Sequence, residues 1–116
     1  MLQSFNLPIW LYPAPVDFRK QMDGLVTLVA DHLSMNPASG QMFVFRNRHQ
    51  NKIKILWWDR NGFWLCYRRL ERGRFTFPPV RDQVIDLTRD QLNWLLSGLD
   101  CLKYPVFPEM DPSNFC

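Results

Sequence analysis

The sequence predicts an α+β domain in which an antiparallel sheet of about four to five strands carries two amphipathic helices packed on one face. Apolar and polar residues alternate on both sides of an Asn-Gly dipeptide between residues 52 and 70, which is typical of a β-hairpin. A leucine-rich stripe with helical spacing lies on each side of this hairpin in the chain and predicts a helix. We assign residues 1–100 to this single domain and residues 101–116 to an extended or disordered tail.

The first part of the chain predicts an edge strand followed by a helix. Residues 8–12 are mostly apolar, and Pro13 and Pro15 end the strand because proline has no N–H to donate to a ladder. Four later apolar residues share one helical face: Leu25, Leu28, Val29 and Leu33. Either Asp17 or Asp23 suits the N-cap of this helix, since an acid also favours the positive end of the helix dipole.

The middle of the chain predicts a three-stranded meander, formed by residues 42–46 and the hairpin. With Asn61-Gly62 as a type I′ loop, Lys54 faces Arg69, and we expect an anion, either Glu71 or a phosphate backbone, to offset the cost of this like-charge pair. A three-residue loop with a glycine bulge would instead invert the faces of one strand. In the two-residue register, one hairpin face carries Lys52, Lys54, Leu56, Trp58, Leu65, Tyr67 and Arg69, and the other carries Ile53, Ile55, Trp57, Asp59, Trp64, Cys66, Arg68 and Leu70.

The last part of the domain predicts one more short strand and the second helix. Phe75 and Phe77 alternate before two prolines, and residues 84–86 suit a strand. Thr88 and Gln91 have the spacing of a capping box, and Gly98 is a natural stop for the helix. Its apolar stripe consists of Leu92, Leu95, Leu96 and Leu99.

Composition excludes several classes of protein. With 116 residues, 47% of them hydrophobic and 22% charged, the chain is long and apolar enough to form one core. The three cysteines are widely spaced and form no CxxC, so neither a disulfide framework nor a zinc site is predicted. The first residues lack the features of a signal peptide, and no apolar run approaches the ~20 residues of a membrane helix. We therefore expect a cytoplasmic protein without membrane contact.

The net charge of +3 conceals an uneven distribution of charge. Residues 46–81 contain ten of the fourteen Lys and Arg residues but only two acids, Asp59 and Glu71, which gives this segment a charge of +8. The remainder of the chain carries −5. A segregated positive field of this kind attracts polyanions even when the whole protein is nearly neutral.

Basic residues and aromatic rings alternate in this segment, a pattern that suits a nucleic-acid-binding surface. Lys and Arg neutralise phosphates and release counterions, while an exposed ring stacks on an unpaired base. The plainer interpretation is a solvated sheet face whose rings are covered by a helix or by the tail. The candidate nucleic-acid-binding residues are Arg46, Arg48, Lys52, Lys54, Trp58, Tyr67, Arg69, Arg72 and Arg74.

Nothing in the sequence favours catalysis. The acids are dispersed along the chain, whereas metal-dependent strand transfer needs converging carboxylates. His32 and His49 stand alone, and no glycine-rich phosphate loop is present. We therefore expect a protein that is not an enzyme and that has no catalytic residue, no metal and no cofactor.

Four stretches of the chain together resemble a known family. They are DFRKQMDGL (residues 17–25), FVFRNR (43–48), KIKILWWDRNGFWL (52–65) and YRRLERGRFTFP (67–78). The sequence resembles TnpB, the Orf2-like accessory protein of the bacterial insertion-sequence family numbered sixty-six. It departs from the usual pattern at Phe18, Gln21 and Asn47.

This resemblance implies a small protein that is encoded beside a transposase and needed for movement of the element. We therefore expect a non-catalytic accessory factor for DNA transposition, with the DNA element ends, the transposase of the same element, or both as partners. The alternative is a protein–protein scaffold that docks on an acidic transposase surface and does not touch DNA. Whether the chain forms homo-oligomers stays open at this point.

Overall fold

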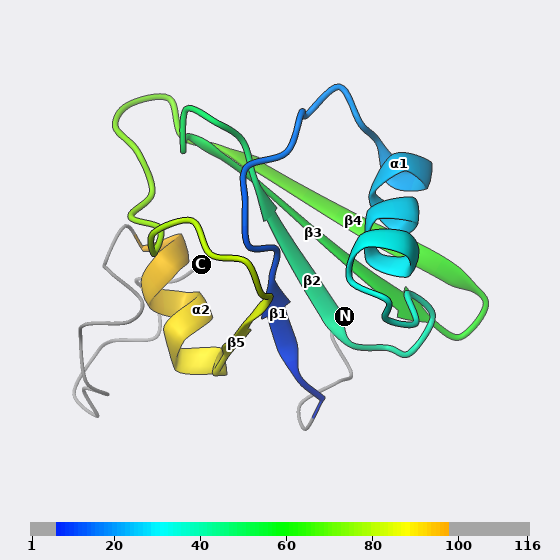
Figure 1. Cartoon of the computed structure of the whole chain (residues 1–116). Coiled ribbons are helices and arrows are strands. Elements are labelled where there is room, and N and C mark those ends of the chain that lie inside the picture. Colours follow the sequence, from blue (N-terminus) through cyan, green and yellow to red (C-terminus); the bar gives the residue numbers. More distant parts are fainter. Residues whose placement is uncertain (1–6, 98–116) are drawn as a thin grey trace.

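A computed structural model describes residues 7–97 and arranges them around one five-stranded sheet (Figure 1). The strand order is β4-β3-β2-β1-β5, so the long β3–β4 hairpin forms one margin of the sheet. The prediction that the first strand is an edge strand is wrong, because β1 pairs with β2 on one side and β5 on the other. The elements in chain order are β1 (Ile9–Leu11), α1 (Met22–Thr27), the π-helical turn η1 (Leu28–His32), β2 (Met42–Arg46), β3 (Lys52–Asp59), β4 (Gly62–Arg69), β5 (Ile85–Leu87) and α2 (Arg89–Leu96).

The predicted α+β class is confirmed, but the sheet is mixed and not purely antiparallel. Strands β1 and β2 pair in parallel, with Ile9 beside Met42, while the other three pairings are antiparallel. The reason lies in the connection, because the chain between β1 and β2 forms α1 and η1. A crossover of this length returns the chain to the same end of the sheet and so makes the next strand parallel.

The prediction that both helices pack on one face of the sheet is wrong. One core joins Leu92 and Leu95 of α2 to Met42 and Val44 of β2. A second core joins Leu25 and Val29 to Phe43 and Phe45 of the same strand. Because successive side chains of a strand point to opposite faces, α1 and α2 cover opposite faces of the sheet, as Figure 1 also shows. All five residues of β2 are consequently buried.

The first helix starts differently from the prediction. Its N-cap is Gln21, which makes no side-chain capping bond, whereas Asp23 lies inside the first turn, where its charge favours the helix dipole. The helix then widens, so that the Leu33 N–H donates to the Leu28 carbonyl oxygen at 3.1 Å. Asp17 lies before the helix and binds Arg19 instead of capping the helix. The Asp17 Oδ1 accepts from the Arg19 backbone N–H at 2.9 Å.

The second helix begins as predicted. Thr88 is the N-cap, its Oγ1 accepts from the Gln91 N–H at 3.0 Å, and the Gln91 side chain accepts from the Thr88 N–H at 2.8 Å. This confirms the capping box. The predicted stop at Gly98, the contribution of Leu99 and the predicted tail lie outside the described residues.

The hairpin register differs from the prediction by two residues. Asp59 pairs with Gly62, so the two-residue loop is Arg60-Asn61 and Gly62 belongs to β4. A shift of two leaves every residue on its predicted face, but Lys54 now faces Tyr67 and the like-charge pair is Lys52 with Arg69.

Aromatic pairing explains why this register forms. Trp57 faces Trp64 with ring centroids 6.1 Å apart, and Trp58 faces Phe63 at 5.0 Å. Cross-strand aromatic pairs stabilise a sheet by up to about 1 kcal/mol each, whereas the predicted register would set each tryptophan opposite a smaller residue. This register places Arg60 in the left-handed region, with a φ of 62°, a backbone conformation that is unfavourable for a residue with a Cβ atom.

This turn gives a stability prediction. We expect Arg60→Gly to raise the free energy of unfolding by about 1 kcal/mol, because glycine adopts a positive φ without the Cβ clash. Urea denaturation measures the change, with Arg60→Ala as the control that loses the same side chain but keeps the clash. An equal effect of the two substitutions would show that the backbone of the turn is unstrained.

Candidate nucleic-acid interface

An open groove of about 870 Å³ lies on the α1 face, at the end of the sheet where β3 begins and β4 ends. Its walls come from the segment before α1, from the loop after β2 and from β3 and β4. The charged and aromatic side chains that line it include Phe18, Arg48, His49, Lys52, Lys54 and Tyr67. Segments distant in the sequence therefore meet at one basic groove.

The loop after β2 is held in a tight shape by Asn47. The Asn47 Oδ1 accepts from the backbone N–H groups of Asn51 and Lys52 at 3.1 and 3.0 Å, and its Nδ2 donates to Asn51 Oδ1 at 2.7 Å. Asn47 is itself buried, whereas Arg48 and His49 are exposed. The loop thus presents a cation and an imidazole at the rim of the groove.

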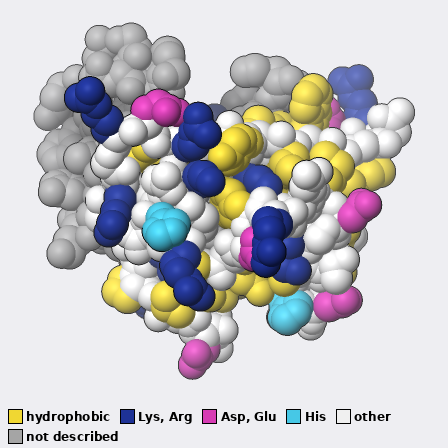
Figure 2. Space-filling view, turned by 90° about the horizontal axis from the view of Figure 1, so that it is seen from above, with side chains coloured by type: hydrophobic (Ala, Val, Ile, Leu, Met, Phe, Trp, Pro, Cys, Tyr) yellow, Lys and Arg dark blue, Asp and Glu magenta, His cyan; other side chains and the backbone are white. Residues whose placement is uncertain are grey.

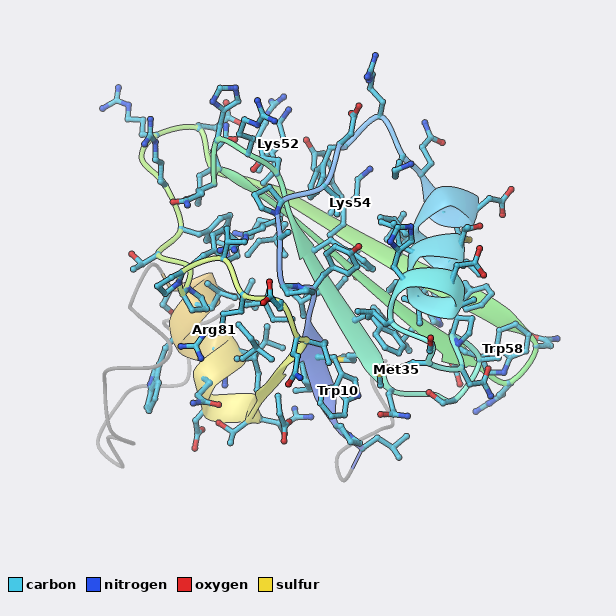
Figure 3. The ribbon with its side chains drawn as sticks, viewed as in Figure 1. Trp10, Met35, Lys52, Lys54, Trp58 and Arg81 are labelled. Carbon is cyan, nitrogen blue, oxygen red and sulfur yellow. The ribbon has the colours of Figure 1, made fainter. Side chains whose placement is uncertain are left out.

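Lys54 lies at the floor of the groove and is only 8% exposed. Its Nζ donates to the carbonyl oxygens of Phe18 and Lys20 at 3.1 and 2.9 Å, and it lies 4.8 Å from the centre of the Phe18 ring. Burial, with a smaller contribution from the charge of Lys52, lowers the pKa of Lys54 below its ordinary value. Lys54 therefore ties the segment before α1 to the sheet (Figure 3).

The other wall of the groove contains an ion pair. The Arg19 guanidinium donates to both carboxylate oxygens of Asp17, with Nε–Oδ2 at 2.8 Å. The hydrogen bonds from the Arg19 side chain and backbone lower the pKa of Asp17 to about 2. Arg19 therefore adds little net charge to the groove.

The cations at this end of the molecule fall into two groups. Arg48, Arg72 and Arg74 are exposed and make no ion pair within residues 7–97. Lys52 is half-buried beside Arg69, and the Arg69 Nε donates to Glu71 at 3.0 Å. Glu71 is therefore one anion that offsets the like-charge pair. Figure 2, which looks down on this end, shows several separate Lys and Arg side chains, with Asp and Glu side chains among them and near the margins.

Five of the nine sequence-predicted residues do not line the groove: Arg69 at the end of β4, Arg72 and Arg74 after it, and Arg46 and Trp58. Arg46 is 1% exposed on the α2 face; it donates to the carbonyl oxygens of Pro78 at 2.9 Å and Pro13 at 3.5 Å, and lies 4.9 Å from the Phe77 ring centre. Trp58 is half-buried at the turn end of the hairpin. Six residues of extended strand separate it from Lys52, roughly 20 Å (Figure 3).

Tyr67 is the exposed ring of the groove. It is 53% exposed on β4, opposite Lys54, and its ring centre lies 6.3 Å from that of Phe18. Phe18, Arg19 and His49 line the same groove but were not among the sequence-predicted residues. The proximity of Phe18 and Arg19 to β3 depends on the Lys54 contact with the Phe18 and Lys20 carbonyls, which no local pattern signals, whereas His49 lies in the loop directly before β3.

Within residues 7–97 the structure contains no group of three or more His, Cys, Asp or Glu side chains able to hold a metal ion. In the same range no helix is long and apolar enough to cross a membrane.

Comparison with known families now identifies the chain. The family model described as "IS66 Orf2 like protein" matches residues 7–105, which include every residue of the groove. The chain belongs to this family. Membership implies an accessory role in the transposition of an insertion sequence.

Two relatives of this IS66 Orf2-like chain occur in Sinorhizobium fredii (strain NBRC 101917 / NGR234). The uncharacterized protein y4jC is 36% identical over 111 residues, which cover 96% of this chain and 95% of the relative. The uncharacterized protein y4hO is 37% identical over 95 residues, covering 82% and 83%. No solved structure matches the IS66 Orf2-like chain.

Proposed function

We propose that this protein is a non-catalytic accessory factor that binds the DNA ends of its insertion sequence, and the transposase of the same element, through the basic groove. The observation that carries the proposal is the gathering of cations at one end of the molecule, all exposed except the half-buried Lys52. These are Arg48, Lys52, Arg69, Arg72 and Arg74.

The chemistry of these side chains suits a phosphate backbone. Arginine presents a planar fork that bonds two phosphate oxygens at once. Arg48, Arg72 and Arg74 have no carboxylate partner within the described residues, so no internal ion pair must break before they contact phosphate. Tyr67 adds an exposed ring beside these cations, which suits stacking on a base that is not paired.

Fluorescence anisotropy with labelled element-end DNA tests this proposal. Five phosphate contacts predict a slope of about −4.5 in a plot of log affinity against log salt concentration. The double variant Arg48→Glu/Lys52→Glu should bind about 100-fold more weakly, and its slope should be shallower by about 2.

A matched control reverses two charges that do not line the groove. Arg60 and Arg81 are both exposed, Arg60 at the hairpin turn and Arg81 before β5, so Arg60→Glu/Arg81→Glu changes the net charge equally. We expect this control to retain most of the affinity of the unmodified protein. Equal losses in both double variants would mean that only net charge matters and would contradict a localised site.

The scaffold alternative has one observation in its favour. Asp17 and Glu71 lie among the cations of this surface, and a surface of mixed sign suits an acidic protein better than a uniform polyanion. Three results together would favour docking on the transposase. The transposase would co-purify with the protein in the absence of DNA, the double variant Arg48→Glu/Lys52→Glu would lose this co-purification, and the protein would show no salt-dependent DNA binding.

A further inference from the structure

Strand β4 is an unprotected sheet edge. It is the outermost strand and pairs only with β3. The two-residue loop makes Asp59 and Gly62 a hydrogen-bonded pair, so alternate residues of β4 from Gly62 onward bond to β3. The Leu70 N–H, which donates to the Asn51 carbonyl oxygen at 2.8 Å, continues this alternation. The N–H and C=O groups of Phe63, Leu65, Tyr67 and Arg69 therefore point away from the sheet.

Most of the usual devices that protect an edge are missing from β4, whose only charged residues are Arg68 and Arg69 at its end. The strand contains no proline and no lysine, and its register with β3 is continuous, without a bulge. Trp64 and Tyr67 are 51% and 53% exposed, one on each face of the sheet. An edge of eight residues with exposed aromatic side chains is a template for another strand.

An apolar hollow accompanies this edge on the α2 face. It has a volume of about 390 Å³, and its lining includes Trp57, Trp64 and Cys66 of the hairpin together with Leu92 and Leu96 of α2. A strand added beside β4 would place side chains next to Trp64 and Cys66, at the rim of this hollow. The edge therefore offers both backbone hydrogen bonds and apolar surface.

We infer that β4 pairs antiparallel with β4 of a second copy of the chain, about a two-fold axis at Leu65, and joins the two sheets into one. In this register Phe63 faces Tyr67 of the second copy, and Trp64 faces its Cys66. The outward-pointing residues of both strands become hydrogen-bonded pairs. The interface is isologous, as in most homodimers.

Charge complementarity selects a second copy as the occupant. The same register sets Gly62 opposite Arg68 of the second copy, and Asp59 is the neighbour of Gly62 on the same face. Gly62 has no side chain, and the space where one would lie is open. Arg68 is exposed and makes no ion pair within residues 7–97, so it extends across Gly62 toward Asp59. The Asp59 carboxylate already accepts from Trp64 Nε1 at 3.3 Å and lies 3.9 Å from the exposed Arg60, and Arg68 adds a second cation to it. The two-fold axis creates this pair twice.

The C-terminal segment of the same chain fits the edge less well. Prolines at positions 105, 108 and 112 divide residues 101–116 into stretches of at most four residues. Proline lacks the N–H that a ladder requires, so none of these stretches matches the span from Phe63 to Arg69. A strand of the transposase is the remaining competitor and is distinguished by the experiment.

Analytical ultracentrifugation of the full-length protein tests the inference, with a monomer mass of 13.9 kDa. We expect a dimer whose dissociation constant rises about 100-fold in Asp59→Arg and in Arg68→Asp, and returns toward the original value when both changes are combined. Asp31→Arg and Arg81→Asp are matched controls at exposed positions outside the hairpin and should not change the dissociation constant.

Disulfide trapping adds a test of the register. In a background with Cys101→Ser and Cys116→Ser, Trp64→Cys faces Cys66 of the second copy in a non-hydrogen-bonded pair, at a separation that a disulfide spans. Mild oxidation should then yield a covalent dimer, whereas Asp31→Cys, an exposed position on η1 outside the hollow, should not in the same background. A monomer at all concentrations, or one that acquires a partner at β4 only from added transposase, would overturn the inference. Because neither measurement uses DNA, its failure is separate from failure of the proposed function.

Discussion

Replacement of Arg46 with alanine is expected to lower the free energy of unfolding by about 3–5 kcal/mol. The guanidinium is 1% exposed, donates to the carbonyl oxygens of Pro78 and Pro13, and lies over the Phe77 ring. Its removal leaves a cavity and takes from the buried Pro78 carbonyl its guanidinium donor, while the Pro13 carbonyl keeps the Arg81 N–H at 3.1 Å. The substitution also detaches the segments that contain Pro13 and Pro78 from β2. Urea denaturation followed by tryptophan fluorescence measures the effect.

Arg48→Ala is the matched control for this prediction. Arg48 lies two residues further along the chain but is exposed, so its loss should change stability by less than about 0.5 kcal/mol. Arg48→Ala should weaken DNA binding more than Arg46→Ala, because Arg48 borders the groove and Arg46 lies on the other face. A stability change below about 1 kcal/mol in Arg46→Ala would contradict the role assigned to its hydrogen bonds.

Lys54→Met is expected to cost about 2–4 kcal/mol of stability, although methionine nearly matches the length of the lysine side chain. The loss arises because the carbonyl oxygens of Phe18 and Lys20 no longer have a donor, and each carbonyl that stays buried without one costs about 1–3 kcal/mol. Hydrogen exchange should show faster exchange of backbone amides in the segment before α1. Lys52→Met is the control, since Lys52 lies on the same face and its ammonium makes no hydrogen bond within the described residues.

The pH dependence separates the charge of Lys54 from its hydrogen bonds. The folded-state pKa of Lys54 lies below its ordinary value of 10.5, chiefly because of burial, so the unfolded chain holds this proton more tightly than the folded one. The contribution of Lys54 to stability therefore rises as the pH increases through its folded pKa toward 10.5. The difference in stability between the unmodified protein and Lys54→Met should widen over that range. A constant difference would contradict the lowered pKa.

The sequence was a good guide to which residues share a face of the hairpin and a poor guide to which residues are opposite each other. Alternation has a period of two, so it specifies faces whatever the register. Asn61-Gly62 indicated the loop, but pairing of Trp57 with Trp64 and of Trp58 with Phe63 moved the loop to Arg60-Asn61. Side-chain contact across the strands outweighed the preference of the turn.

The positions of the helices were not predicted because an amphipathic stripe shows that a helix packs, but not on which side of the sheet. One signal was available in residues 42–45, which are four apolar residues in succession. A strand without polar alternation is typically buried on both faces, and this requires cover on each side. The structure meets that requirement with α1 on one face and α2 on the other.

The sequence predicted which segment is basic, but not which of its cations are exposed and which are buried. Arg46 and Lys54 each donate to backbone carbonyls of segments more than thirty residues away, contacts that no local pattern reveals. The remaining cations lie near loops and strand ends, where exposure is the rule. Local sequence therefore located the basic region, while long-range contacts decided which cations are exposed.

The complete burial of β2 has a consequence for where this molecule is able to meet others. Because β2 is packed on both faces, it exposes no surface to a partner, and the centre of the sheet contributes only to the stability of the fold. Recognition is displaced to the periphery, to the loops at one end and to the outermost strand. Substitutions at the periphery should change binding, whereas substitutions in the centre of the sheet should change folding.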